Sequence, residues 1–137
     1  MSAMSTYLEN KIANHVLRNT AFTTPGDAVY VGLIKFYETK TLEPGTLTQE
    51  VGTGSYARIQ VNGTGGWDAP SDGATQNTAV ITFPTATGNW GNVSGVIVSD
   101  AASAGNVLLH GSLTTARDVK NGDVFKFNAG DLDITFA

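Results

Sequence analysis

The side chains best suited to acid–base chemistry near neutral pH are two histidines, His15 and His110. His15 falls within a helical pattern and His110 within a strand pattern. Neither is close in sequence to an arrangement of Ser, Asp or Glu that matches a known nucleophile motif. We therefore expect both histidines to be structural, and the sequence indicates no catalytic residue.

Carboxylates are the other candidates for chemistry. Asp131 and Asp133 fall on one side of the last predicted strand, and Asp68 and Asp72 share a loop. Oxygen-rich loops can bind Ca²⁺, which takes about six to eight ligands, but no segment has the calcium-loop pattern. The glutamates lie in the predicted helix and one polar loop rather than on strands facing a cleft, which argues against a glycosidase pair. With no cysteine in the chain, we predict no metal site and no cofactor.

The two tryptophans raise the question of a binding site. Trp90 is flanked by small and turn-forming residues, in the run TGNWGN, rather than by convergent polar partners. A ligand pocket normally adds a few well-placed polar groups to its apolar wall. We therefore favour a loop that folds the indole of Trp90 onto the end of the fold or onto a neighbouring subunit, and the same for Trp67. A pocket wall is the alternative.

Composition limits the classes of function. The chain has 137 residues, of which 41% are hydrophobic and 15% charged, with a net charge of −4. Its eight Lys and Arg residues form no cluster, which argues against nucleic-acid binding because phosphates are contacted by grouped cations. No stretch approaches the roughly 20 apolar residues that span a bilayer. The first ten residues lack the basic and apolar parts of a signal peptide, so we expect assembly in a cytoplasm.

The elements that must position these residues begin with one helix over residues 6–18. Thr6 and Glu9 have the spacing of a capping box. Leu8, Ile12 and Val16 lie four residues apart and form one apolar stripe. A helix of this length is marginal in isolation, so its stripe needs a surface to lie on.

From residue 28 onward the hydrophobic period changes to that of strands. The run 28–36 predicts a strand buried on both faces, and Asn121-Gly122 predicts a tight type I′ hairpin. Further strands are predicted over 56–61, 78–83, 93–99, 106–113, 118–127 and 132–136. About seven or eight short strands after one N-terminal helix predict a mainly β, single-domain antiparallel β-sandwich, jelly-roll-like or immunoglobulin-like, with a flattened barrel as the alternative.

Five segments, taken together, resemble a known family. They are TYLENKIANHVLR, AVYVGLI, GSYARIQV, FPTATGNWGNV and LLHGSLTTARDVKNGDVFKFNAGDLDIT, in this order. The order is similar to that of small virion proteins of tailed bacteriophages that are labelled tail-fibre-like, and it covers nearly the whole chain. The resemblance implies a structural protein that is not an enzyme.

Our leading hypothesis is a capsid cement or decoration protein that binds the outer surface of a phage particle, with a tail-fibre or baseplate module that contacts the host surface as the alternative. A carbohydrate-binding or hydrolytic sandwich is the candidate from another class. The expected partners are a major capsid protein or tail proteins, together with further copies of the chain in a homo-oligomer, and neither nucleic acid nor membrane. The predicted partner-contact residues are Tyr7, Leu8, Ile12, Val16, Trp67 and Trp90.

Overall fold

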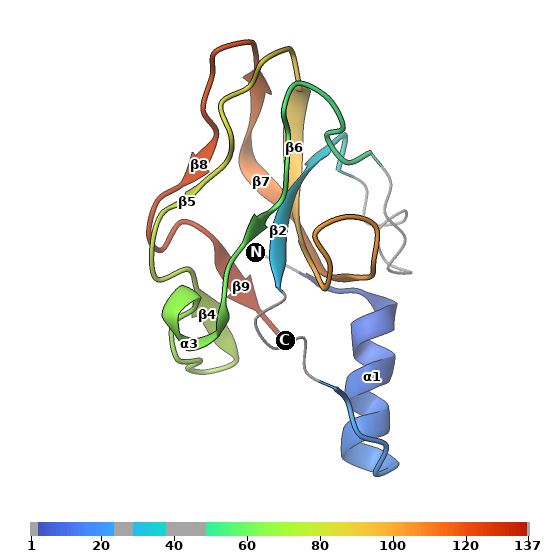
Figure 1. Ribbon diagram of the computed structural model, residues 1–137. Coiled ribbons are helices and arrows are strands. Elements are labelled where there is room, and N and C mark those ends of the chain that lie inside the picture. The colour runs from blue at the N-terminus through green and yellow to red at the C-terminus, as the bar shows by residue number, and fades with distance from the viewer. Residues whose placement is uncertain (1–2, 24–28, 38–48, 137) are drawn as a thin grey trace.

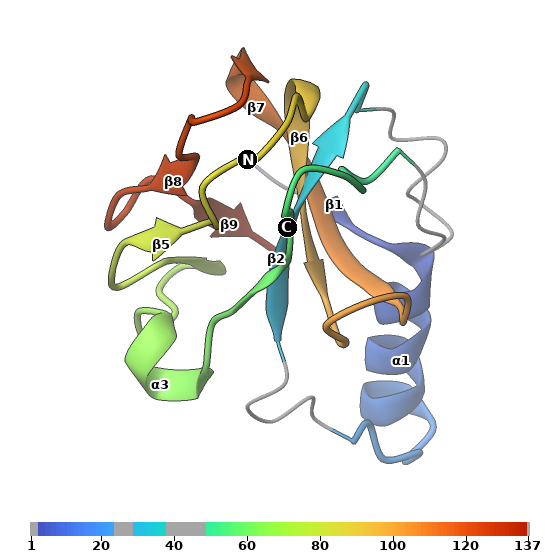
Figure 2. The same ribbon diagram turned by 45° about the horizontal axis from the view of Figure 1, so that its top comes forward.

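The computed structural model describes residues 3–23, 29–37 and 49–136 (Figure 1). Its larger antiparallel sheet has five strands in the order β1 (Ala3–Met4), β7 (Val107–Val119), β6 (Gly91–Ser99), β2 (Tyr30–Lys35) and β3 (Ile59–Gln60). Two further antiparallel pairs join β4 (Ala74–Gln76) to β9 (Asp133–Thr135) and β5 (Ile81–Thr82) to β8 (Lys126–Phe127). Both pairs lie on the same side of the larger sheet in Figures 1 and 2. The predicted mainly β, sandwich-like fold with an N-terminal helix is confirmed.

The main core fills the space between the larger sheet and the two strand pairs. Alternate residues of the central strands face it, among them Val31 and Leu33 of β2, both 0% exposed. The opposite layer contributes three phenylalanines whose rings meet at steep angles, with centroids 5.3 Å apart for Phe125 and Phe127 and 5.9 Å apart for Phe83 and Phe125. Such edge-to-face contacts add to the burial of the rings. This aromatic cluster, Phe83, Phe125 and Phe127, closes one part of the core.

The other face of the larger sheet is also covered. Ile34, Ile97 and Val107 form a second buried cluster against which Tyr37 packs. A Cβ atom on Gly95 would lie 2.7 Å from the ring of Tyr37, so the absence of a side chain there lets the ring lie on β6. All four inner residues of β2 are buried, which confirms the prediction of a strand buried on both faces.

Helix α1 (Thr6–Leu17) is anchored at its first turn. The predicted capping box at Thr6 and Glu9 is wrong, because the N-cap is Ser5. Its hydroxyl accepts a hydrogen bond from the Leu8 amide at 3.3 Å and donates one to the carbonyl oxygen of Val107. The buried hydroxyl thus joins the start of α1 to the start of β7. No helix in the described ranges is both long enough and apolar enough to cross a membrane.

The predicted strand over 56–61 is largely wrong. Only Ile59–Gln60 pair with β2. In a regular strand Ala57 would share the apolar face of Ile59 and Val61, but Ala57 is exposed, whereas Arg58, which would lie on the polar face, is buried. Burial of Arg58 is possible because the carboxylate of Glu50 pairs with its guanidinium, 2.8 Å from Nε. Alternation alone could not reveal a charge with a partner eight positions away.

The predicted type I′ hairpin at Asn121-Gly122 is also wrong. Gly122 has a φ of +91°, but Asn121 is not among the residues with positive φ, and β8 pairs with β5 rather than with β7. Backbone hydrogen bonds at Phe83 and Ala86 hold the chain after the turn, from Phe83 N–H to the Phe125 carbonyl and from Ala86 N–H to the Asp123 carbonyl, both at 2.9 Å. Because of these bonds, the chain after Gly122 joins β5 in the layer opposite the larger sheet.

The segment over 62–77, which lies between two of the predicted strands and is interpreted from its sequence as turns, contains regular structure. A short helix, α3 (Gly63–Gly66), precedes Trp67, and β4 follows it and pairs with β9. Its register joins Thr75 to Ile134. The strand pair β4–β9 forms a wall of the site described next.

Candidate functional site

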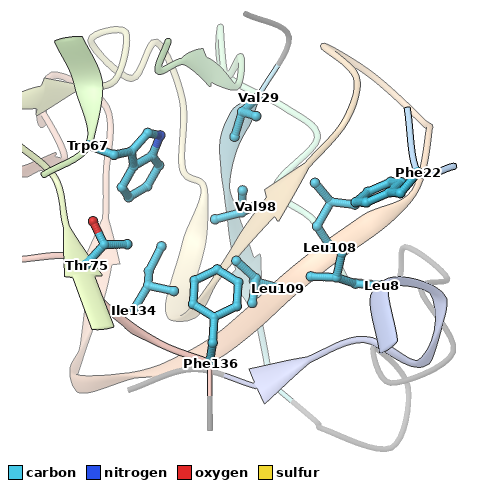
Figure 3. A pocket seen from close by; sticks show the side chains of 10 residues that line it. All are labelled: Leu8, Phe22, Val29, Trp67, Thr75, Val98, Leu108, Leu109, Ile134 and Phe136. Carbon is cyan, nitrogen blue, oxygen red and sulfur yellow. The ribbon is translucent and has the colours of Figure 1, made fainter. Parts of the chain in front are cut away.

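An apolar pocket of about 230 Å³ lies where several elements end on the same side of the molecule. It sits between α1 and the strand pair β4–β9, with the last residues of β6 and the first residues of β7 behind it (Figure 3). Trp67 and Phe22 lie on opposite sides of the pocket, and Phe136 lies between them. The residues that line it are Leu8, Phe22, Val29, Trp67, Thr75, Val98, Leu108, Leu109, Ile134 and Phe136.

A β-bulge in β7 supplies two adjacent leucines to the pocket. Val107 pairs with Ser99, but Leu109 pairs with Val98, so one extra residue, Leu108, lies between the two pairs. In a regular strand, adjacent side chains point to opposite faces, and a bulge relaxes that rule. Leu108 and Leu109 are therefore both able to line the same pocket.

The pocket provides no polar group for chemistry. Thr75 is the one lining residue with a polar side-chain oxygen, and this hydroxyl donates to the carbonyl oxygen of Asp68 at 2.6 Å. The indole N–H of Trp67 donates to the carbonyl oxygen of Val61 at 3.3 Å. A pocket of this kind can bury apolar side chains of a partner, because burial of apolar surface needs no directional contacts.

Beside the pocket the surface is acidic. A shallow polar groove shares Thr75 with the pocket and is lined in part by Asp68 and Asp133. The Thr78 hydroxyl, at 2.8 Å, and the Gln76 amide, at 2.9 Å, donate to the Asp68 carboxylate and lower its pKa below the ordinary value. Asp68 therefore carries a negative charge at neutral pH.

A densely hydrogen-bonded polar cluster comprises Glu50, Tyr56 and Arg58, and none of the three lines the pocket. The Tyr56 hydroxyl donates to Glu50 at 2.7 Å and accepts from the Leu33 amide at 2.9 Å. Burial, followed by the nearby Glu50 carboxylate, raises the pKa of Tyr56 well above its ordinary value. Arg58 Nη1 also donates to the carbonyl oxygens of Ala101, at 2.6 Å, and Ala104, at 3.1 Å. These bonds tie two loops to the sheet, which is a structural role.

The two histidines lie in separate places. His15 is exposed near the end of α1, where its Nδ1 accepts a hydrogen bond from the Phe22 amide at 3.2 Å. His110 is 1% exposed, and its Nδ1 is 2.8 Å from the Tyr37 hydroxyl. The structure does not bring the two together. Among the described residues, no group of His, Asp and Glu side chains could hold a metal ion.

Trp90 belongs to the core. It is 2% exposed, its indole N–H donates to the carbonyl oxygen of Gly54 at 2.8 Å, and its ring meets the edge of Tyr56 with centroids 5.4 Å apart. A Cβ atom on Gly54, which has a φ of +64°, would lie 2.9 Å from the indole nitrogen. The structure therefore supports the core interpretation of Trp90 over the pocket wall, whereas Trp67 does line a pocket.

The other predicted contact residues all lie on α1. Leu8 is 6% exposed and lines the pocket, Tyr7 and Ile12 are half-buried, and Val16 is 69% exposed. Their contact with a partner stays a prediction. Five further lining residues were not predicted as members of one site: Phe22, Val29, Leu108, Leu109 and Phe136. Their shared signal is only that they are apolar and fall at the ends of elements.

Comparison with known proteins gives one family. The family model described as "Podophage GP4 fiber I protein gp80" matches residues 3–135. No curated protein matches the chain.

Proposed function

Because the chain belongs to the podophage GP4 fiber I protein gp80 family, we propose that it is a structural, non-enzymatic module of the fibres of a tailed-phage virion. The observation that carries the proposal is the extent of the match, residues 3–135, which includes both layers of the fold and α1. It supports the tail-fibre alternative of the sequence analysis better than the capsid cement hypothesis.

The polar chemistry of the chain supports a structural role. Of the two histidines, His110 is buried against Tyr37, and His15 is exposed with its Nδ1 accepting a hydrogen bond from the Phe22 amide. The pocket supplies apolar surface only. A fibre module needs a rigid body and surfaces for its neighbours, and these features provide both. The proposed partners are other virion proteins, and the proposed location is the virion, after assembly in the host cytoplasm.

Immunogold electron microscopy of purified virions tests the location. An antibody raised against this protein should label fibres at the tail end of the particle, with an antibody against the major capsid protein as the matched control. Labelling distributed over the capsid faces, like that of the control, would overturn the fibre proposal in favour of a cement protein. Absence of the protein from purified virions, shown by mass spectrometry, would overturn the structural role altogether.

A further inference from the structure

The end of α1 presents apolar side chains that are exposed in the described structure. Leu8, in the first turn, is 6% exposed, but Val16 is 69% exposed and Leu17 is 81% exposed. Figure 1 shows the last turns of α1 leaving the body of the molecule. The stripe that begins at Leu8 thus runs from the core into open solvent. The helix is held at its buried N-cap, Ser5, so its end projects in a fixed direction.

A concave apolar surface lies at the same end of the molecule. The pocket between Trp67, Phe22 and Phe136 includes Leu8 in its lining, so it adjoins the buried half of α1. Its volume of about 230 Å³ is ample for aliphatic side chains, and its lining has no charged residue. The chain therefore carries a projecting apolar tip and an apolar recess side by side.

The charges around these two surfaces are opposite. The last turn of α1 and its C-cap carry His15 and Arg18, with no acidic residue, and Lys11 lies one turn earlier. The segments that contain β4 and β9 carry Asp68, Asp72, Asp131 and Asp133, and the sequence has no Lys or Arg between Arg58 and Arg117. Attraction between a basic tip and an acidic rim favours their encounter and orients it.

We propose that a second copy of this chain inserts the end of its α1, with Val16 and Leu17, into the apolar pocket. The basic C-cap Arg18 then lies near the acidic groove of Asp68 and Asp133. Because the tip and the pocket are at the same end of one molecule, two copies can exchange tips reciprocally about a two-fold axis, which doubles the buried surface. The inference concerns self-association and holds whether or not the fibre location is correct.

Cysteine cross-linking tests the contact directly, because the chain has no cysteine of its own. Leu17→Cys protein is mixed with Thr75→Cys protein under mild oxidation, so that one copy carries the thiol on the tip and the other carries it in the pocket wall. A mixed disulfide dimer should be the main product. The matched control replaces Thr75→Cys with Val124→Cys, a residue that is 42% exposed and outside the pocket lining. Equal cross-linking to Val124→Cys would overturn the proposal.

Analytical ultracentrifugation measures how much Val16 and Leu17 contribute to dimerisation. The double variant Val16→Ser/Leu17→Ser should weaken dimerisation by about ten-fold or more, because each buried aliphatic side chain contributes apolar surface. The matched control Val80→Ser changes a residue that is 52% exposed away from the pocket, and it should leave the dimer unchanged. A wild-type protein that stays monomeric at all concentrations, or a dimer indifferent to the double variant, would overturn the proposal.

A charge exchange supplies a second, independent readout. Arg18→Glu should weaken the dimer by about three-fold at low salt, within the range for exposed charge pairs. Asp133→Lys in the same chain should restore it, because the exchange recreates opposite charges. Restoration that is lost at high salt supports the contact. Failure of Asp133→Lys to restore association at any ionic strength contradicts the proposed orientation of the tip.

Discussion

Replacement of Trp90 gives the sharpest test of how the fold is held together. Its side chain is 2% exposed and contacts the ring of Tyr56. Trp90→Ala removes the buried ring, its aromatic contact and its hydrogen bond, and leaves a cavity. Changes of this type cost about 3–5 kcal/mol. This is a large share of the roughly 5–15 kcal/mol that stabilises a typical domain.

Trp90→Phe separates the hydrogen bond from the apolar burial. The phenyl ring keeps most of the apolar contact, but the carbonyl oxygen of Gly54 loses the donor that lies 2.8 Å away. This oxygen still accepts a hydrogen bond from the Thr87 amide at 3.0 Å, so the substitution removes one hydrogen bond, which is worth about 0.5–1.5 kcal/mol. We therefore expect an intermediate loss of stability for Trp90→Phe, smaller than for Trp90→Ala.

Urea unfolding followed by far-ultraviolet circular dichroism is the appropriate measurement, because the substitutions remove one of the two tryptophan fluorophores. Trp67→Phe is the matched control: its indole bond to Val61 is longer, at 3.3 Å, and its side chain is half-buried in the pocket wall. It should cost less than Trp90→Phe. If Trp90→Ala unfolds within about 0.5 kcal/mol of the wild type, the indole is not a core element, and a role in surface binding would be the better account.

Three further predictions follow from the polar contacts. Tyr56→Phe should destabilise by about 1–3 kcal/mol in urea unfolding, because it removes the partner of both the Leu33 amide and Glu50. Since the pKa of Tyr56 is raised in the folded protein, the wild type should lose stability as the pH rises above about 10, the unfolded value, and Tyr56→Phe should lose less; equal alkaline loss in both would contradict this. Ser5→Ala should cost about 1–2 kcal/mol by thermal unfolding through the lost helix cap, and a neutral result would show that another group caps α1. Thr78→Val should raise the pKa of Asp68 toward its ordinary value in a carboxyl NMR titration, since the Thr78 hydroxyl bond is the main cause of its lowering; an unchanged pKa would refute that cause.

The local sequence predicted the elements whose own residues are sufficient to define them. The strand over 28–36 appears as β2 because its continuous apolar run is buried on both faces of the sheet, and the helix over 6–18 appears as α1 with Leu8 of its apolar stripe in the core. Predictions were wrong where a residue distant in sequence decides whether a side chain is buried or which strand the chain pairs with. The buried Arg58 depends on Glu50, and the path after Gly122 depends on bonds from Phe83 and Ala86.

The pocket could not be predicted because it belongs to no single element. Its lining comes from segments around residues 8, 22, 67, 108 and 136, and only the three-dimensional arrangement brings them together. Alternation in the last strand predicts Phe136 on the same inward face as Leu132 and Ile134, but Phe136 is 40% exposed and lines the pocket. The bulge at Leu108 gives no comparable signal, because the run around it is continuously apolar and any register fits it equally well.

The aromatic cluster of the core and the pocket are formed by different residues. The rings of Phe83, Phe125 and Phe127 pack against one another without contributing to the pocket lining. The pocket shares other residues with the main core, since Leu8, Val98, Leu108, Leu109 and Ile134 line it and are already buried, whereas Phe136 at its rim is 40% exposed. Binding of a second copy would then add apolar burial to a domain that is already folded, with little ordering entropy to offset. A contact surface whose base is already buried in the folded subunit suits a module that is incorporated after folding into a larger assembly.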